Sequence, residues 1–380
     1  MSDQPRMRPR AIGFAAIGAL ALAALAGCGD LGKKPQTLRI YNWSDYIDPT
    51  ILSDFKKETG INVVYDTYDN NEIVETRLLA GGSGYDIAVP SNQYVERLAQ
   101  AGALAEIDQT KLSNRTNLWP FIVQQMEKFD PGLAHSVPYM WGTVGIGYNV
   151  EAVQKRLPGV AIDSWAIAFD PANLAKLKDC GVMFLDSAEE IYPAVLRYQG
   201  KDPNSTNVAD YEAATELLMA LRPSIQKFHS SELINALAGG DICLAIGYSG
   251  DVFQAKTRAA SAGASGASAK AVTIDYVIPK EGAQLWFDSF VMPKDAPNKE
   301  AAHTFINYIL RPDVAARASN YVQYASGNLP AKQLVDPAVR DNPGVYPSDE
   351  VLSRAFVVTT KAPTLVRDIN REWTKVRSGI

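Results

Sequence analysis

Aromatic and acidic side chains recur close together along this chain, at spacings that suit the binding of a cation. An aromatic ring offers its negative face to a positive charge and its apolar surface to methylene groups. A carboxylate accepts a charge-assisted hydrogen bond from an N–H donor. The combination is therefore typical of a site for an organic ammonium ion. The stretches concerned are Trp43-Ser44-Asp45-Tyr46, Ser91-Asn92-Gln93, Asp186-Ser187-Ala188-Glu189-Glu190, Tyr248-Ser249-Gly250-Asp251 and Trp286-Phe287-Asp288.

Pairs of this kind also arise without any function. With 35 aromatic and 42 acidic residues, about 8 aromatic-then-acidic pairs at such spacings are expected by chance. Four of the five stretches, however, fall where a predicted strand ends. Because open α/β sheets bind ligands at the carboxyl ends of their strands, position rather than composition favours a cation site.

The elements that would position these residues alternate between strand and helix. Residues 38–41 predict an apolar-alternating strand, and a helix is expected from Pro49 to a stop at Gly60. The pattern continues with strands at 61–65 and 85–90 and with helices at 71–80 and 93–101. This alternation predicts βαβ units, a largely parallel sheet and an α/β fold.

A second α/β region is predicted after an apolar, Gly-rich run at residues 137–149. The run has no helical periodicity, so it is either an ordinary buried strand or the passage between two lobes. About 350 residues exceed what one hydrophobic core normally supports, which predicts two domains.

Residues 1–27 are predicted to be a signal peptide. Arg6, Arg8 and Arg10 precede an uncharged apolar run at 11–26, which is too short for a membrane-spanning helix. The run ends in Leu25-Ala26-Gly27-Cys28, which resembles the lipobox of bacterial lipoproteins, where the cysteine is lipidated and becomes the first mature residue. The alternative is an ordinary secretory signal with an incidental cysteine. Residues 28–37 would then form a tether.

The charge balance argues against nucleic acid and anionic membrane as partners. The chain has a net charge of −5, and the 34 basic and 41 acidic residues from Cys28 onward give −7. No basic stripe or Lys/Arg cluster occurs, and an acidic surface suits a cationic ligand.

Two cysteines remain after the leader, Cys180 and Cys243. An even number in an exported protein permits one disulfide. Two buried free thiols are the alternative.

Signals for an enzyme, a metal site or a cofactor are missing from the sequence. His135, His229 and His303 are scattered without metal-ligand spacing. There is no Gly-x-Ser-x-Gly elbow, no phosphate loop and no Gly-x-Gly-x-x-Gly after a strand. We therefore expect no catalytic residues, no bound metal and no cofactor, although an enzyme acting on amines stays an alternative.

Several motifs together resemble the polyamine-binding proteins of bacterial ABC importers, nearest the putrescine-binding type. The resemblance runs nearly in register from about residue 38 to the end of the chain. Its motifs include Tyr41-Asn42-Trp43-Ser44-Asp45-Tyr46-Ile47, Val89-Pro90-Ser91, Pro138-Tyr139-Met140-Trp141-Gly142-Thr143, Gly200-Lys201-Asp202-Pro203-Asn204-Ser205-Thr206, Phe228-His229-Ser230-Ser231, Gly240-Asp241-Ile242-Cys243 and Leu310-Arg311-Pro312-Asp313-Val314.

The resemblance implies a type II periplasmic binding protein with two lobes, each a mixed sheet flanked by helices, and a ligand cleft between them. Residues 38–138 plus 285–325 would form the N-terminal lobe, and residues 139–284 plus 326–380 the C-terminal lobe. It also implies a Cys180–Cys243 disulfide. The implied cation-site residues are Trp43, Ser44, Asp45, Tyr46, Ser91, Glu190, Asp251, Asp288 and Tyr324.

Three further expected site residues depart from the putrescine-type pattern. Gln93 stands in place of Ser, Tyr248 in place of Trp, and Trp286 in place of Phe. Trp at the last position is similar to the spermidine-preferring members, and its larger ring offers a stronger cation–π face. The departures leave the preferred polyamine open.

The expected function is capture of a linear polyamine, spermidine or putrescine, in the periplasm and delivery to an inner-membrane ABC permease. The protein would be a monomer that touches the membrane only through a lipid anchor on Cys28. The alternatives are the same fold binding another small organic cation or an amino acid derivative, and a polyamine sensor.

Overall fold

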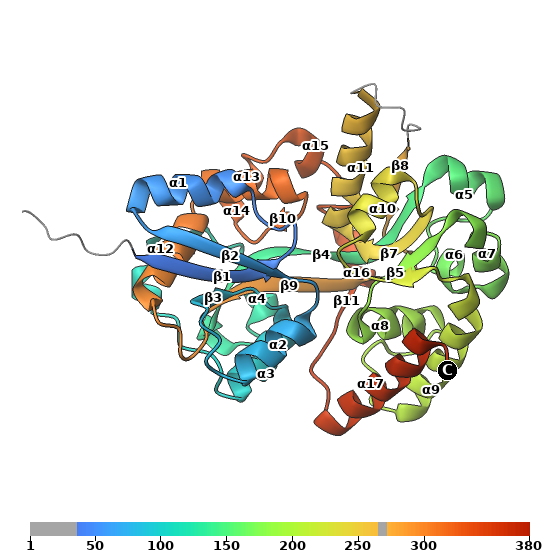
Figure 1. The fold of residues 1–380 in the computed structure, drawn as a ribbon, viewed down its shortest axis with the longest axis horizontal. Helices are drawn as coiled ribbons and strands as arrows, with labels where there is room; N and C mark the ends of the chain where they lie inside the picture. Colours follow the sequence, from blue (N-terminus) through green and yellow to red (C-terminus); the bar gives the residue numbers. More distant parts are fainter. Residues whose placement is uncertain (1–35, 265–271) are drawn as a thin grey trace, which may run out of the picture.

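Figure 1 shows the fold of the chain in a computed structural model, which describes residues 36–264 and 272–380. The predicted signal peptide and Cys28 lie outside the described residues. Strands and helices are arranged in two α/β halves, one on the left and one on the right of the view. The strand order across the sheets is β2-β1-β3-β9-β4-β7-β5-β6.

The left half is built from the first three predicted strand–helix units. β1 (Thr37–Trp43) pairs in parallel with β2 (Asn62–Tyr68) and β3 (Ile87–Ala88). The strands are followed by α1 (Pro49–Thr59), α2 (Asn71–Leu79) and α3 (Asn92–Gln100). Leu38 and Ile40, at alternate positions of β1, are fully buried, as the alternation predicted.

The limits of α1 have clear local causes. The Asp48 side chain accepts a hydrogen bond from the Thr50 N–H, and Pro49 fills the first helical position, which has no need of an N–H. Gly60 ends the helix in the left-handed conformation, with φ of 73°, which glycine adopts without strain. Trp43 to Tyr46 therefore lie in the turn between a buried strand and a capped helix.

The left sheet is mixed, whereas the strand–helix alternation predicted a largely parallel one. β9 (Gln284–Val291) lies antiparallel between β3 and the long strand β4 (Ser136–Asn149). β9 is almost 200 residues away in sequence from β3, so the alternation of strands and helices in the first third of the chain could not predict its insertion. The mixed sheet implied by the family resemblance is the one observed.

The right half repeats the α/β pattern around the second part of β4. That part pairs antiparallel with β7 (Leu244–Tyr248) and β8 (Ile274–Val277). Beyond β7 lie β5 (Val182–Phe184) and β6 (Lys227–Phe228), both parallel. The longer helices here are α8 (Ala188–Tyr198), α9 (Val208–Leu221), α10 (Leu233–Gly239) and α11 (Ser249–Ala264).

β4 joins the two halves. Thr143 pairs with Leu285 of β9, and the next residue, Val144, pairs with Tyr248 of β7. Every residue of β4 except Asn149 is buried. The two alternatives for residues 137–149 therefore describe the same element, because the buried strand is itself a passage between the halves.

The last third of the chain returns to both halves. α12 (Lys299–Ile309) and α13 (Pro312–Val322) pack on the left half, where Phe305 meets Phe55 of α1 with ring centroids 5.1 Å apart. α17 (Pro363–Ser378) packs on α8 and α9 of the right half, as Figure 1 shows in red. The shorter elements are α4 (Pro120–Met126), α5 (Val150–Arg156), α6 (Ala166–Phe169), α7 (Pro171–Ala175), β10 (Ala325–Ser326), α14 (Leu329–Lys332), α15 (Pro337–Arg340), α16 (Asp349–Arg354) and β11 (Phe356–Val357). Within the two described ranges, no helix has the length and apolar character that a membrane span requires.

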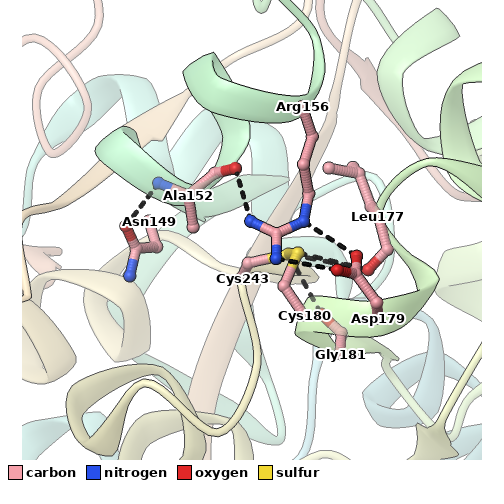
Figure 2. The surroundings of a disulfide bond; sticks show 8 residues. All are labelled: Asn149, Ala152, Arg156, Leu177, Asp179, Cys180, Gly181 and Cys243. Atoms are coloured by element: carbon pink, nitrogen blue, oxygen red, sulfur yellow. Dashed lines mark hydrogen bonds and ion pairs between the residues drawn. A yellow bond between two sulfur atoms is a disulfide. The ribbon is translucent and has the colours of Figure 1, made fainter.

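A disulfide links Cys180 to Cys243, with their Cα atoms 5.5 Å apart, which confirms the predicted pairing. Figure 2 shows the bond beside an ion pair between Arg156 and Asp179, whose nitrogen and oxygen atoms are 2.8 Å apart. Cys180 precedes β5 and Cys243 precedes β7, so the bond ties together the starts of two paired strands.

Replacing both cysteines, as Cys180→Ser with Cys243→Ser, is expected to destabilise the protein. Opening a closed loop of 63 residues restores conformational freedom to the unfolded chain, worth about 4 kcal/mol. Urea unfolding under non-reducing conditions measures the change, and the wild type in a reducing agent is the control that should reach the same value. An unchanged midpoint would show that the bond does not stabilise the fold.

Candidate functional site

A pocket with about 430 Å³ of space between its walls, part of it open to solvent, lies where the ends of strands from both halves meet. Its walls come from the end of β1 and the turn after it, the segments after β2 and β3, the turn before α10, the end of β7, the start of α11, the middle of β9 and the second residue after α13. The lining residues are Trp43, Ser44, Tyr46, Asp69, Ser91, Ser230, Ser231, Tyr248, Asp251, Trp286, Asp288 and Tyr324.

Nine of the twelve residues predicted from the sequence line this pocket. They are Trp43, Ser44, Tyr46, Ser91, Tyr248, Asp251, Trp286, Asp288 and Tyr324. The structure brings together side chains that are up to 281 positions apart in the chain, as Trp43 and Tyr324 are. Asp45, Gln93 and Glu190 lie outside the pocket wall.

Asp288 forms one acidic position of the pocket. It lies in the middle of β9 with 4% of its surface exposed, and its carboxylate accepts a hydrogen bond of 2.6 Å from the Ser91 hydroxyl. The Asn71 side-chain amide fixes Ser91 through two hydrogen bonds of 3.0 Å: it donates one to the Ser91 hydroxyl and accepts one from the Ser91 backbone N–H. Burial raises the pKa of Asp288 to about 7, because a carboxylate removed from water is costly in its charged form.

Asp251, at the start of α11, forms a second acidic position. The Tyr324 hydroxyl donates a hydrogen bond of 2.7 Å to the Asp251 carboxylate and accepts one of 3.1 Å from the Asp251 backbone N–H. Burial raises the pKa of Asp251 to about 7, against the opposing effect of the Tyr324 hydrogen bond. Neither Asp251 nor Asp288 forms an ion pair with any residue of the described ranges.

Aromatic rings form a continuous row along the pocket. Trp43 meets Tyr248 at a centroid distance of 6.3 Å, Tyr248 meets Trp286 at 5.7 Å, and Trp286 meets Tyr324 at 5.1 Å. All three contacts are edge-to-face, the arrangement that ring quadrupoles favour. The Trp43 indole N–H is fixed by a 2.9 Å hydrogen bond to the Val89 carbonyl. The row offers a wall for methylene groups and ring faces for positive charges.

Asp45 points away from this row. Its backbone is in the left-handed region, with φ of 54°, and its carboxylate accepts a 2.6 Å hydrogen bond from the Arg258 guanidinium on α11. The charge of Asp45 is therefore already neutralised by a cation from the other half of the molecule. Sequence spacing cannot reveal this, because Arg258 is 213 positions away.

Gln93 and Glu190 lie outside the pocket wall, where Glu72, Glu189 and Glu190 form a second group of carboxyls. Gln93 donates a hydrogen bond of 2.9 Å to Glu189, and Glu190 is 4% exposed with one carboxyl oxygen unpartnered. Burial, together with nearby Glu72, raises the pKa of Glu190 to about 8. Burial and the charge of Glu189 raise the pKa of Glu72 to about 7.

Three lining residues were not among the predicted ones: Asp69, Ser230 and Ser231. Asp69 follows β2, and the two serines follow β6, so each stands just after a strand that points at the pocket. The strand-end rule used for Asp251 would have selected them. Asp69 was overlooked because no aromatic–acid spacing distinguishes it from the other surface carboxylates of the sequence.

The fold and the pocket together define a class of protein. Two α/β halves share a strand and enclose a pocket whose walls are aromatic rings and carboxylates. Among the residues that the structure describes, no group of three or more His, Cys, Asp or Glu side chains is placed to hold a metal ion. This is the arrangement of a two-lobed binding protein for a small organic solute.

Comparison with known proteins gives the family. The model of the bacterial extracellular solute-binding protein family matches residues 50–347. The putrescine-binding periplasmic protein PotF of Escherichia coli is 49% identical over 353 residues, which cover 92% of this chain and 94% of that protein. The putrescine-binding periplasmic protein SpuD of Pseudomonas aeruginosa is 47% identical over 345 residues, covering 90% and 92%. The chain belongs to the bacterial extracellular solute-binding protein family.

Solved structures confirm the predicted fold. The chain superposes on the spermidine/putrescine ABC transporter substrate-binding protein PotD of Streptococcus pneumoniae with a TM-score of 0.71, at 30% identity and covering 90% of this chain and 99% of that one. The two-lobed type II periplasmic binding protein fold is therefore confirmed. These relatives are binding proteins rather than enzymes, which confirms the prediction that this chain is not an enzyme.

Gly250→Ala is expected to disturb the pocket from its wall. A Cβ atom at position 250 would lie 2.5 Å from the Tyr324 ring, so the ring or the start of α11 must shift. Overpacking of this kind costs about 1–3 kcal/mol, and here it also moves the hydroxyl that hydrogen-bonds Asp251. Urea unfolding and the fluorescence response to putrescine measure the two effects.

Gly247→Ala is the matched control, because its Cβ would meet Leu233 at 2.6 Å, outside the pocket wall. Both variants should lose stability, whereas only Gly250→Ala should lose the response to ligand. Equal behaviour of the two variants would remove Tyr324 from the functional part of the pocket.

Proposed function

We propose that this protein is the periplasmic solute-binding component of an ABC importer and that it binds a linear polyamine in the pocket between its lobes. One observation carries the proposal: Asp251 and Asp288 are two carboxyls that form no ion pair with any residue the structure describes, set in one aromatic pocket. Burying unpaired carboxyls is costly unless a cation joins them. A ligand with ammonium groups joined by methylenes would fit both the carboxyls and the rings.

The comparisons support the same ligand class. The relatives PotF and SpuD are named as putrescine-binding proteins, and PotD as a spermidine/putrescine transporter's binding protein. Each match covers at least nine-tenths of this chain. We assign Trp43, Tyr248, Trp286 and Tyr324 to the methylenes and ammonium faces. Asp251 and Asp288 would accept ammonium hydrogen bonds, with Ser44 and Ser91 as neutral acceptors.

The lobe boundaries are also a proposal. The sequence placed the first crossing between residues 138 and 139 and the last between residues 325 and 326. The strand register supports a crossing inside β4 between Thr143 and Val144, where the partner changes from β9 to β7. We propose this point as the first hinge, and closure of the lobes about it would exclude water and strengthen the charge contacts inside the pocket.

We further propose that the protein works in the periplasm as a monomer that delivers its ligand to an inner-membrane permease. Lipidation of Cys28 would tether it to the membrane near that permease. Mass spectrometry of the protein purified from membranes would detect the lipid, and unmodified Cys28 would point to the ordinary secretory signal instead.

Calorimetric titration with putrescine and spermidine in parallel tests the ligand class. We expect both to bind, and tighter spermidine would assign the preference to Trp286 and its neighbours. Tighter putrescine would shift attention to Tyr248 and Gln93. Absence of heat and of a fluorescence change with either polyamine would contradict the proposal and direct the search to another small cation.

Asp251→Asn is expected to weaken polyamine binding by about 2–5 kcal/mol, the usual loss when one member of a buried charge pair is removed. The change keeps the size of the side chain and removes its charge. Asp275→Asn is the matched control, because Asp275 is an exposed carboxylate of the same half that pairs with Lys256. Wild-type affinity in Asp251→Asn would exclude Asp251 from the site.

Polyamine affinity is expected to rise with pH. In the empty pocket the pKa values of Asp251 and Asp288 are about 7, so both are partly protonated near neutral pH. An ammonium ion favours the ionised carboxyls, so binding below that pH releases protons. For each pH unit below its pKa, each carboxyl that must lose its proton then lowers the polyamine affinity by up to about tenfold. Titrations at about pH 6 and pH 8, in buffers of different ionisation enthalpy, measure both effects.

Asp251→Asn should show a shallower pH dependence than the wild type, since one titrating group is gone. An affinity that is constant over this range in the wild type, with no proton release, would mean that the two carboxyls are already ionised before the ligand enters.

A further inference from the structure

A third carboxylate, Asp69, lies at the outer end of the pocket. It follows β2 and is the only exposed aspartate among the lining residues of this pocket. Asp69 accepts a hydrogen bond of 3.3 Å from the Ser44 hydroxyl of its own lobe and another from the Ser231 hydroxyl of the other lobe. Both donors are neutral.

The charge of Asp69 has no partner in the part of the chain that the structure describes. The ion pairs there bring a cation to Asp45 and to Asp54, on either side of the turn after β1, but none to Asp69. An ionised carboxylate can accept about four hydrogen bonds, so two donors leave Asp69 with free capacity. A cationic donor that enters the pocket can therefore be accepted there.

Ser230, next to Ser231, supplies independent evidence that a ligand group binds at this end of the pocket. Ser230 is 6% exposed and lines the pocket, and its hydroxyl oxygen makes no hydrogen bond with residues 36–264 or 272–380. A buried hydroxyl without a partner loses its hydration and gains nothing in return. A ligand N–H group at this end of the pocket would satisfy it.

The row of rings leads from Asp69 to the other acidic positions. Trp43 is adjacent in sequence to Ser44, which bonds Asp69, and Tyr324 at the other end of the row bonds Asp251. Trp43, Tyr248, Trp286 and Tyr324 follow one another between these ends. The pocket thus carries carboxyls at both ends of one aromatic row, with Asp288 as a third acidic position.

We propose that Asp69, with Ser230 beside it, receives a third ammonium group, so that the pocket discriminates between a triamine and a diamine. The inference rests on the proposed function, since it concerns the same pocket and ligand class. A diamine can satisfy two of the three carboxyls, whereas a triamine can satisfy all of them. Discrimination would then come from the outer end of the pocket as well as from the rings.

The test compares spermidine with putrescine on Asp69→Asn and on the wild type. Because Asp69 is exposed, its contribution is modest, and we expect the variant to weaken spermidine about fivefold more than putrescine. Asp66→Asn is the matched control: Asp66 is an exposed carboxylate of β2, the strand that Asp69 follows, lies outside the pocket wall and accepts a hydrogen bond from Tyr85. The ratio of the two affinities should stay at its wild-type value in Asp66→Asn.

Ser231→Ala separates this role from a simple clasp between the lobes. Losing the Ser231–Asp69 hydrogen bond weakens closure and should weaken both ligands by the same factor. Equal weakening of both ligands in Asp69→Asn would overturn the inference and mean that Asp69 contributes only to closure of the lobes. No weakening of either ligand would also overturn it and mean that Asp69 has no role in binding. A wild type that binds neither polyamine would overturn the proposed function itself.

Acetylated spermidines locate the ammonium group involved. N1-acetylspermidine and N8-acetylspermidine each lack one terminal charge. One of the two should bind Asp69→Asn and the wild type equally, because the group that reaches Asp69 is already neutral. If Asp69→Asn weakens both acetylated ligands as much as it weakens spermidine, no terminal ammonium reaches Asp69 and the inference fails.

Discussion

The pocket depends on one constraint: it buries two carboxyl groups that form no ion pair with any residue the structure describes. Asp251 and Asp288 are held in an aromatic pocket, and burial raises the pKa of each to about 7. Neutral hydroxyl groups offset part of this desolvation cost: Tyr324 donates a hydrogen bond to Asp251, and Ser91 donates one to Asp288. A pocket with this cost built in gains more from an incoming cation than from a neutral solute, because only the cation restores the ionised carboxylates. The pocket therefore favours a cation over a neutral solute, whatever the length of the ligand.

Both lobes contribute to the walls of the pocket. The left lobe supplies Trp43, Ser91 and Asp288, and the right lobe supplies Tyr248 and Asp251. Neither lobe alone holds a complete set of rings and carboxyls, so the site exists only when the lobes meet. The ion pair between Asp45 and Arg258 crosses the same gap outside the pocket. This ion pair is thus separate from the pocket carboxyls Asp251 and Asp288, although Arg258 and Asp251 both lie on α11.

Local sequence signals predicted the parts of the fold that depend on neighbours in the chain. The limits of α1 follow from Asp48, Pro49 and Gly60, and the buried strand at 136–149 follows from its apolar run. The antiparallel insertion of β9 and the turn of Asp45 toward Arg258 depend on residues far away in sequence, which no local pattern contains. The family resemblance placed nine pocket residues, and it placed the Cys180–Cys243 bond. Asp69 stands at a strand end as well, but no aromatic–acid spacing marked it, and its hydrogen bond with Ser231 of the other lobe depends on residues far apart in the sequence.

The sharing of β4 by both sheets has a consequence for how the molecule unfolds. One half cannot release β4 without exposing the edge of the other half's sheet, and an exposed edge with unpaired N–H and C=O groups is unfavourable. The two lobes, which look like separate domains, are therefore thermodynamically coupled through one strand. The two lobes should therefore unfold in a single cooperative transition, because unfolding of either lobe destabilises the other. A chain with two lobes around one pocket thus keeps the cooperativity of a single folding unit.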